Sequence, residues 1–330
     1  MTRGSLFLPV ALIVAIALGA CRDGAGARDD VAQAPPRAGR AAAAIAPLRE
    51  RVARHVDSLA AAGGHRTRAL YTAGNRWAVD YVARAMRSAG IAARIDSIGR
   101  RGLVNVVGII EGRSDSVLVI GAHVDASASR DRGWSRDWRT MPAPGAVDNA
   151  TGVAALLEIG AELRRGLPPR YTIELVAFNA EEYSPNHRGH HLGSRSYVRR
   201  LKKEGRPVKG AIVLDMVASN PELRRVELFS SAIARPLAQE LAEAASVVAG
   251  PLELVDRRSA CSKSDNESFD RAGVPAVLFM ESCAPWKTTP GHPRFAAYHT
   301  ARDIPSEVSI DVVAEIVRIV TTYARPGRVA

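Results

Sequence analysis

The sequence predicts an α/β fold: a single three-layer α/β/α domain with a mixed, largely parallel sheet. In some segments apolar residues recur at helical spacing, whereas others are short β-branched runs, and the two kinds alternate along most of the chain. Strands that alternate with helices form a largely parallel sheet covered on both faces. The 330 residues suffice for one large domain or two small ones, and no internal repeat or composition shift marks a boundary within the folded part.

The expected elements follow from these two spacings. Leu48, Val52, Val56 and Leu59 recur at helical spacing and predict a helix over residues 48–62. Further helices are expected over residues 75–88, 150–163, 193–204, 232–248, 268–272 and 310–323. Strands are expected over the apolar runs at residues 91–98, 104–110, 117–122, 171–178, 211–214, 226–229 and 274–280.

Composition excludes one class of partner. The formal net charge is +11, but the basic residues are scattered and only 5% of the residues are aromatic. A nucleic-acid-binding protein would show a clustered basic stripe or a recognisable binding module. We therefore expect no nucleic-acid partner, and the composition leaves the oligomeric state open.

The N-terminus resembles the signal peptide of a bacterial lipoprotein. Arg3 precedes an apolar run over residues 6–18, which is too short to span a bilayer comfortably and suits an export signal. The run leads into Gly19-Ala20-Cys21, which is similar to the lipobox whose cysteine becomes the lipidated first residue. The alternative is an ordinary signal peptide with a chance cysteine.

This resemblance divides the chain into three parts. Residues 1–20 would be the signal peptide, and residues 21–47 a flexible tether, because a stretch rich in Ala, Gly, Pro, Arg and Asp cannot bury a core. Residues 48–330 would form the folded, catalytic domain. Arg22 rather than Asp follows the cysteine, so the resemblance implies an exported protein anchored in the outer membrane, facing the periplasm, through a lipid on Cys21.

Two further cysteines, Cys261 and Cys283, lie in the folded part. An export compartment permits disulfides, and an even number is consistent with one bridge. Two cysteines do not establish that bridge, so the sequence leaves the pairing open.

Residues of metal-binding types follow four of the predicted strands. They are His123-Val124-Asp125 after 117–122, Asn179-Ala180-Glu181-Glu182 after 171–178, Asp215 after 211–214 and Glu281 after 274–280. Ligands of such sheets bind beyond the carboxyl ends of the strands. Each motif alone has an ordinary explanation, such as a hydrogen-bonded pair near a turn, a solvated loop, or a helix cap at Asp148-Asn149. It is their combination that indicates a site.

The order of these motifs resembles one family: zinc-dependent aminopeptidases of the bacterial leucyl aminopeptidase and aminopeptidase Y type, in metallopeptidase clan MH. The resemblance covers roughly residues 50–325. The similar segments are Gly121-Ala122-His123-Val124-Asp125, Pro144-Gly145-Ala146-Val147-Asp148-Asn149-Ala150-Thr151-Gly152, Phe178-Asn179-Ala180-Glu181-Glu182, Leu214-Asp215-Met216, Ser264-Asp265-Asn266 and Tyr298-His299-Thr300.

The resemblance implies a centre with two zinc ions and an exopeptidase that releases N-terminal residues from peptides. His123 and Asp215 would bind one zinc ion, and Glu182 and His299 the other. Asp148 would bridge both ions. Imidazole and carboxylate groups are suitable zinc ligands, and two metals about 3.5–4 Å apart can act on one peptide carbonyl.

The same resemblance gives two further carboxylates a role in catalysis. Asp125 would orient His123 from the side of the imidazole that faces away from the metal, as carboxylates beside ligating histidines do. Glu181 would be the general base, because a carboxylate that is free of the metal can accept the proton of water and pass it to the leaving amine.

Three features depart from the family pattern or are left open by it. Asn266 stands where the family often has histidine, which predicts an altered pocket lining. The long segment 126–147 contains Trp134 and Trp138, and it is either part of the pocket rim or a surface flap. The inserted histidines are expected in a solvated loop rather than at a metal; they are His187, His190 and His191.

Other functions remain open from the sequence. A glutaminyl cyclase would share the fold but use one zinc ion, and 148–152 resembles the peptidase version more closely. A carboxypeptidase or dipeptidase is a further alternative. A non-catalytic, receptor-like relative would usually have lost metal ligands, and all five are present here.

Overall fold

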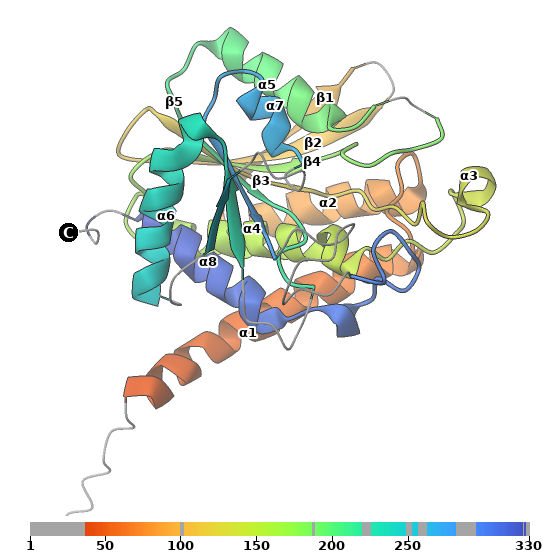
Figure 1. Cartoon of the computed structure of the whole chain (residues 1–330), viewed down its shortest axis with the longest axis horizontal. Helices are drawn as coiled ribbons and strands as arrows, with labels where there is room; N and C mark the ends of the chain where they lie inside the picture. Colours follow the sequence, from red (N-terminus) through yellow and green to blue (C-terminus); the bar gives the residue numbers. More distant parts are fainter. Residues whose placement is uncertain are drawn as a thin grey trace, which may run out of the picture.

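The structure is a computed structural model, which describes residues 37–99, 102–186, 189–219, 226–248, 253–256, 263–281, 295–325 and 327. Within these residues a single eight-stranded sheet lies between two layers of helices (Figure 1). The predicted three-layer arrangement is therefore confirmed. None of the helices in the described ranges combines the length and hydropathy that crossing a membrane requires.

The sheet is mixed, with a parallel centre. The strands are β1 (Ala92–Ile98), β2 (Leu103–Ile110), β3 (Val117–His123), β4 (Thr172–Phe178), β5 (Val208–Leu214), β6 (Glu227–Ser230), β7 (Glu253–Asp256) and β8 (Ala276–Met280). Their order across the sheet is β1-β2-β4-β3-β5-β8-β6-β7. The four central strands β4, β3, β5 and β8 are parallel neighbours, whereas β2 runs antiparallel to β4, and β6 to β8. All four strands that lead into metal-binding residue types thus lie side by side and point the same way.

Helices cover both faces of this sheet (Figure 1). One layer consists of α1 (Arg37–Ala61), α2 (Ala73–Ser88), α4 (Thr151–Arg164), α6 (Arg235–Val248) and α8 (Ile310–Ala324). The opposite layer consists of α5 (Leu192–Glu204) and the short α7 (Asn266–Asp270). A one-turn helix, α3 (Trp134–Asp137), lies in the long segment before α4.

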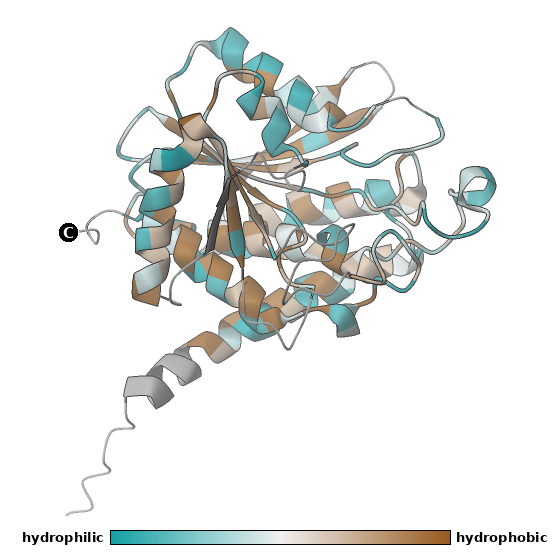
Figure 2. Ribbon diagram, viewed as in Figure 1, coloured by the Kyte–Doolittle hydropathy of each residue, from teal (hydrophilic) through white to brown (hydrophobic). Residues whose placement is uncertain are grey.

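Strand β3 shows how one sequence serves both layers. Its residues are all buried, and successive side chains of a strand point to opposite faces. Leu118 and Ile120 belong to the large core under α1, α4 and α8, while Val117 and Val119 belong to the smaller core under α5. The hydropathy colouring shows brown strands with brown helix surfaces turned toward them (Figure 2). A continuous apolar run is therefore what a central, doubly covered strand requires.

The first helix is longer than the apolar pattern predicts. The first helix begins at Arg37 rather than at residue 48, and its first turns project from the domain (Figure 1). The Ala-rich stretch 41–44 has high helix propensity, which extends the helix past the end of the apolar pattern. Strand β7 was not predicted, because its two apolar residues are adjacent, between Glu253 and Asp256, and show no alternation. Cys21, Cys261 and Cys283 lie outside the described residues.

Candidate metal centre

The site lies at the carboxyl ends of the central strands. His123 is the last residue of β3, Asp215 follows β5, and Glu181 and Glu182 follow β4. Because these strands are parallel neighbours, their carboxyl ends meet at one edge of the sheet. Glu281, which follows β8, takes a different role: it accepts a hydrogen bond from the backbone N–H of Ser219. Three of the four strand endings therefore form the site.

The carboxylate of Asp148 is the centre of the cluster. Its Oδ1 lies 3.1 Å from Nε2 of His123, and its Oδ2 lies 3.1 Å from Nε2 of His299. The two histidines have further carboxylate partners: Asp215 Oδ1 lies 3.3 Å from His123 Nε2, and Glu182 Oε1 lies 2.8 Å from His299 Nε2. One aspartate thus connects two His–carboxylate pairs, and these five residues are the predicted ligands.

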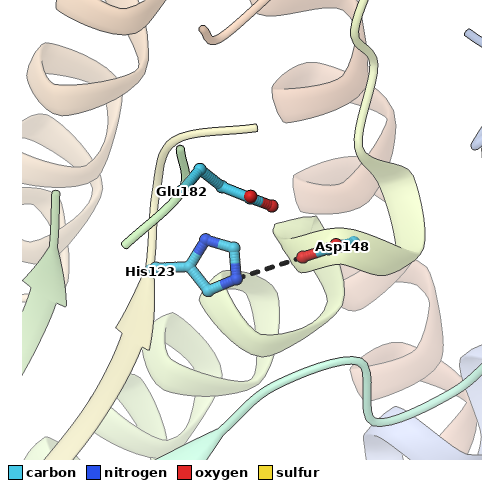
Figure 3. Close-up of side chains that lie close together, drawn as sticks. All are labelled: His123, Asp148 and Glu182. Carbon is cyan, nitrogen blue, oxygen red and sulfur yellow. Dashed lines mark ion pairs between the residues drawn. The ribbon is translucent and has the colours of Figure 1, made fainter. Parts of the chain in front are cut away.

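The donor set fits a metal ion. Ligand atoms of His123, Asp148 and Glu182 all lie within 4.8 Å of one another, and Figure 3 shows the three side chains converging. Imidazole nitrogen and carboxylate oxygen are the donors that zinc takes in catalytic sites, at about 2.0–2.2 Å. All three residues are buried, so the donors are held in place by the surrounding fold.

Burial and charge set the protonation of these groups. Burial raises the pKa of Glu181 well above its usual value, and burial likewise raises the pKa of Glu182. Burial would lower the pKa of His299, but the carboxylates of Glu182 and Asp148 raise it to about 10. The histidine proton here neutralises buried carboxylate charge. A divalent cation would replace it, since a histidine that ligates a metal is neutral and binding releases protons.

Two buried side chains, Asp303 and Arg68, hold the backbone around Asp148. The carboxylate of Asp303 accepts hydrogen bonds from the backbone N–H groups of Val147 at 2.7 Å and of Asp148 at 3.0 Å. The fully buried Arg68 donates to the carbonyls of Val124, at 3.0 Å, and of Gly145, at 2.9 Å. Neither Asp303 nor Arg68 was predicted. The position of Asp303, four residues after His299, was the only available signal.

The sequence left a helix-capping role open for Asp148-Asn149, and in the structure Asn149 takes this role. Its Oδ1 accepts a hydrogen bond from the backbone N–H of Gly152 at 3.0 Å, and its Nδ2 donates to the carbonyl of Leu214 at 2.8 Å. Asn149 therefore satisfies a donor at the start of α4 and ties it to the end of β5. Because of this, the Asp148 carboxylate is free to face the two histidines.

Asp125 connects the ends of two strands. Its carboxylate oxygen lies 3.7 Å from Nδ1 of His123, a longer contact than a hydrogen bond, and Nδ1 is 3.2 Å from the backbone carbonyl of Asp125. The Asp125 carboxylate accepts hydrogen bonds from the backbone N–H groups of Glu181 at 3.3 Å and Glu182 at 3.0 Å. Asp125 thus lies behind His123, as the resemblance implied, and it also fixes the Glu181-Glu182 pair.

The long segment 126–147 contacts the centre. The Ser129 hydroxyl lies 3.1 Å from Nδ1 of His299, and the backbone N–H of Arg130 donates to the His299 carbonyl at 3.0 Å. The ring of Tyr298 stacks on His299 at 3.7 Å between centroids. We had left open whether this segment forms a rim of the site or a surface flap. Its contacts with His299 make it a rim beside the candidate ligands. Its tryptophans do not line the centre but are buried in a separate apolar cluster of Ala69, Ala128, Trp134, Trp138 and Ala143.

We expected the inserted histidines to lie in a solvated loop, but one of them, His191, is buried. His191 is only 7% exposed, and its Nε2 lies 3.0 Å from Oε1 of Glu181. That expectation was wrong because the loop folds back onto the end of β4, which a local pattern cannot show. His190 is exposed, in keeping with the expectation, and His187 lies outside the described residues.

Comparison with known proteins identifies the family. Residues 105–324 match the sequence pattern of peptidase family M28. The chain belongs to this family. The match confirms the resemblance inferred from the motifs, and it covers every candidate ligand of the centre.

Several curated relatives of this chain are aminopeptidases by name. A probable leucine aminopeptidase of Trichophyton verrucosum is 27% identical over 216 residues, which are 62% of this chain and 55% of that protein. Another from Arthroderma otae is 25% identical over 257 residues, which are 75% and 63% of the two chains. This chain therefore spans little more than half the length of these relatives.

Solved structures show the same fold at lower identity. The LapA aminopeptidase of Legionella pneumophila is 16% identical with a TM-score of 0.68, covering 88% of this chain and 74% of LapA. A glutaminyl cyclase of Bacteroides thetaiotaomicron, bound to N-acetylhistamine, is 20% identical with a TM-score of 0.67, covering 85% and 98%. At these identities the likeness concerns the fold alone, and both enzymes share it.

Removing one donor from the centre should reduce the metal content. We expect Glu182→Gln to bind less zinc than the wild type, because an uncharged amide replaces a carboxylate that lies between a histidine and the Asp148 carboxylate. Elemental analysis of the purified protein measures this directly. Glu243→Gln, on the exposed side of α6, is the matched control and should keep the full zinc content. Equal zinc in the two variants would exclude Glu182 as a ligand.

Proposed function

We propose that this protein is a co-catalytic di-zinc exopeptidase, an aminopeptidase that releases N-terminal residues from peptides. The observation that supports this best is the geometry of Asp148, which presents one carboxylate oxygen to each of two histidines. A site for a single ion needs only one carboxylate oxygen of Asp148 with one histidine beside it. A carboxylate with a separate histidine at each oxygen is what two neighbouring ions would share.

Five residues would hold the two ions. His123 and Asp215 would bind the first, Glu182 and His299 the second, and Asp148 both. When bound, the ions supply Lewis-acid polarisation of the peptide carbonyl and lower the pKa of water. The remaining steps belong to the side chains around them.

Glu181 is the residue to move the proton. It is buried beside the cluster, and its Oε1 lies 3.0 Å from Nε2 of His191, which is not one of the candidate metal ligands. In this role Glu181 would take a proton from water during attack and give it to the leaving amine. Asp125 would fix its backbone during this cycle, through the hydrogen bond to the Glu181 N–H.

The charge around the centre favours a substrate with a free amine. Five buried carboxylates gather there: Asp125, Asp148, Glu181, Glu182 and Asp215. Two divalent ions and the buried Arg68 would supply five positive charges, but Asp265 and Asp303 add two further buried carboxylates to these five. The remaining negative charge would attract a protonated N-terminus. The leucine aminopeptidase relatives support this choice over a carboxypeptidase or dipeptidase, and membership of a peptidase family supports it over a single-zinc glutaminyl cyclase.

The free amine can be tested with matched substrates. We expect hydrolysis of an unblocked aminoacyl anilide, and at least about a 100-fold lower kcat/KM for its N-acetyl form, because acetylation leaves buried polar groups unpaired. The assay compares both substrates with the zinc-loaded protein and after chelation. Efficient cleavage of the acetylated substrate would contradict the aminopeptidase assignment. Cyclisation of an N-terminal glutamine without hydrolysis would instead favour a cyclase.

We further propose that the protein is exported and anchored in the outer membrane, facing the periplasm, by a lipid on Cys21. The support is the N-terminal sequence: an apolar run over residues 6–18, small residues before the cysteine, and Arg22 after it. The anchor would precede the helix that begins at Arg37, so the catalytic domain would need no membrane contact of its own.

Cys21→Ser should separate anchoring from catalysis. Without the thiol there is no attachment point for the lipid, so we expect the variant to move from the membrane fraction to the soluble fraction with unchanged kcat/KM. Fractionation followed by immunoblotting of wild type and variant checks this. If the variant stays in the membrane fraction, the proposed anchor is wrong.

A further inference from the structure

His191 lies directly against the carboxylate assigned as the general base. Its Nε2 is 3.0 Å from Oε1 of Glu181, and its backbone N–H donates to the Glu181 carbonyl at 3.2 Å. The side-chain contact of His191 is thus with one carboxylate oxygen, Oε1. The second oxygen, Oε2, is thereby left for water or substrate.

The histidine is itself rigidly held. It is the residue before α5, with a positive φ of 60°, and its carbonyl accepts hydrogen bonds from the backbone N–H of Arg195 at 3.0 Å and the hydroxyl of Ser194 at 3.2 Å. The next residue, Leu192, donates its backbone N–H to the carbonyl of Ala180 at 2.8 Å. The loop end and the start of α5 therefore hold the ring at a fixed distance from Glu181.

The protonation of His191 and Glu181 determines which of the two can donate a hydrogen bond. Burial lowers the pKa of His191, so the ring carries one proton at neutral pH. When Glu181 is ionised to act as the base, its carboxylate can only accept, so a hydrogen bond across the 3.0 Å contact places the imidazole proton on Nε2. Asp265, also buried, lies close enough to both groups to interact electrostatically with Glu181 and His191. Without a hydrogen bond from His191, the Glu181 carboxylate could rotate away from the Asp265 carboxylate, because like charges repel.

We propose that His191 is a positioning residue for the reaction: it donates Nε2–H to Oε1 of Glu181 and thereby aims Oε2 at the proton to be transferred. This inference rests on the proposed function, in which Glu181 is the base. The competing explanation is a buried histidine that merely closes the loop at the start of α5. The two explanations differ in whether loss of the imidazole acts through Glu181.

Substitution of His191 separates these explanations. We expect His191→Leu to lower kcat by about 10- to 100-fold, the usual loss when a hydrogen bond that orients a reacting group is removed, with KM and zinc content unchanged. His191→Gln should recover most of this loss, because the glutamine Nε2 can donate from nearly the same place. His190→Leu is the matched control: its ring lies 3.2 Å from the Glu181 backbone carbonyl and beside the rings of Tyr183 and His191, but these contacts do not involve the Glu181 carboxylate, so kcat should stay near wild type.

A double-mutant comparison tests the route of the effect. In a Glu181→Gln background, His191→Leu should lower the residual kcat little further, because the group it positions is already inactive. If the two losses multiply, or if Gln is as poor as Leu at position 191, the histidine has a structural role and the proposal is overturned. Wild-type kcat in His191→Leu would overturn it as well.

A spectroscopic measurement needs no activity. In protein labelled with ¹⁵N-histidine, the His191 ring signals, identified by their loss in His191→Gln, should show a neutral ring protonated at Nε2, and Glu181→Gln should shift them. A proton on Nδ1 instead would exclude the proposed donation. Because this result does not depend on turnover, a protein that hydrolyses no peptide would refute the proposed function while the contact itself was still decided.

Discussion

The two oxygens of the Asp148 carboxylate face different histidines, and both contacts are buried. Bringing five carboxylates together inside a protein is unfavourable unless positive charge is present among them. Burial would lower the pKa values of His123 and His299, but their carboxylate neighbours raise them, which favours a positive charge on both rings when no metal is bound. Metal ions would provide it more strongly. Much of the surrounding structure serves to keep this one carboxylate in place.

The fold supplies the geometry in two ways. The four parallel central strands bring residues far apart in sequence to one edge, where His123, Asp215 and the Glu181-Glu182 pair meet. Asp148 and His299 are not at strand ends, so they need other supports. Asp303 accepts hydrogen bonds from the backbone N–H groups of Val147 and Asp148, and the segment 126–147 holds His299 through its own backbone and hydroxyl contacts. Strand ends place three of the five candidate ligands, and loops place the other two.

The same division explains what could be predicted from the sequence. Periodicity and strand endings located the central strands and their polar residues, since a buried parallel strand has an unmistakable apolar run. The family resemblance added Asp148 and His299. The supports at Asp303, Arg68 and His191 depend on contacts between distant segments, for which a single sequence carries no local signal. The start of the first helix was also missed, because the Ala-rich residues before Leu48 favour a helix but show no apolar period.

Direct location of the metal ions would test the bridging role of Asp148 best. Crystals of the zinc-loaded protein can be measured on both sides of the zinc absorption edge, so that anomalous scattering marks zinc alone. We predict two peaks about 3.5–4 Å apart, one beside His123 and Asp215 and the other beside Glu182 and His299, with one Asp148 oxygen next to each. A single peak shared by His123, Asp148 and Glu182, or a second peak away from Asp148, would contradict the two-metal centre.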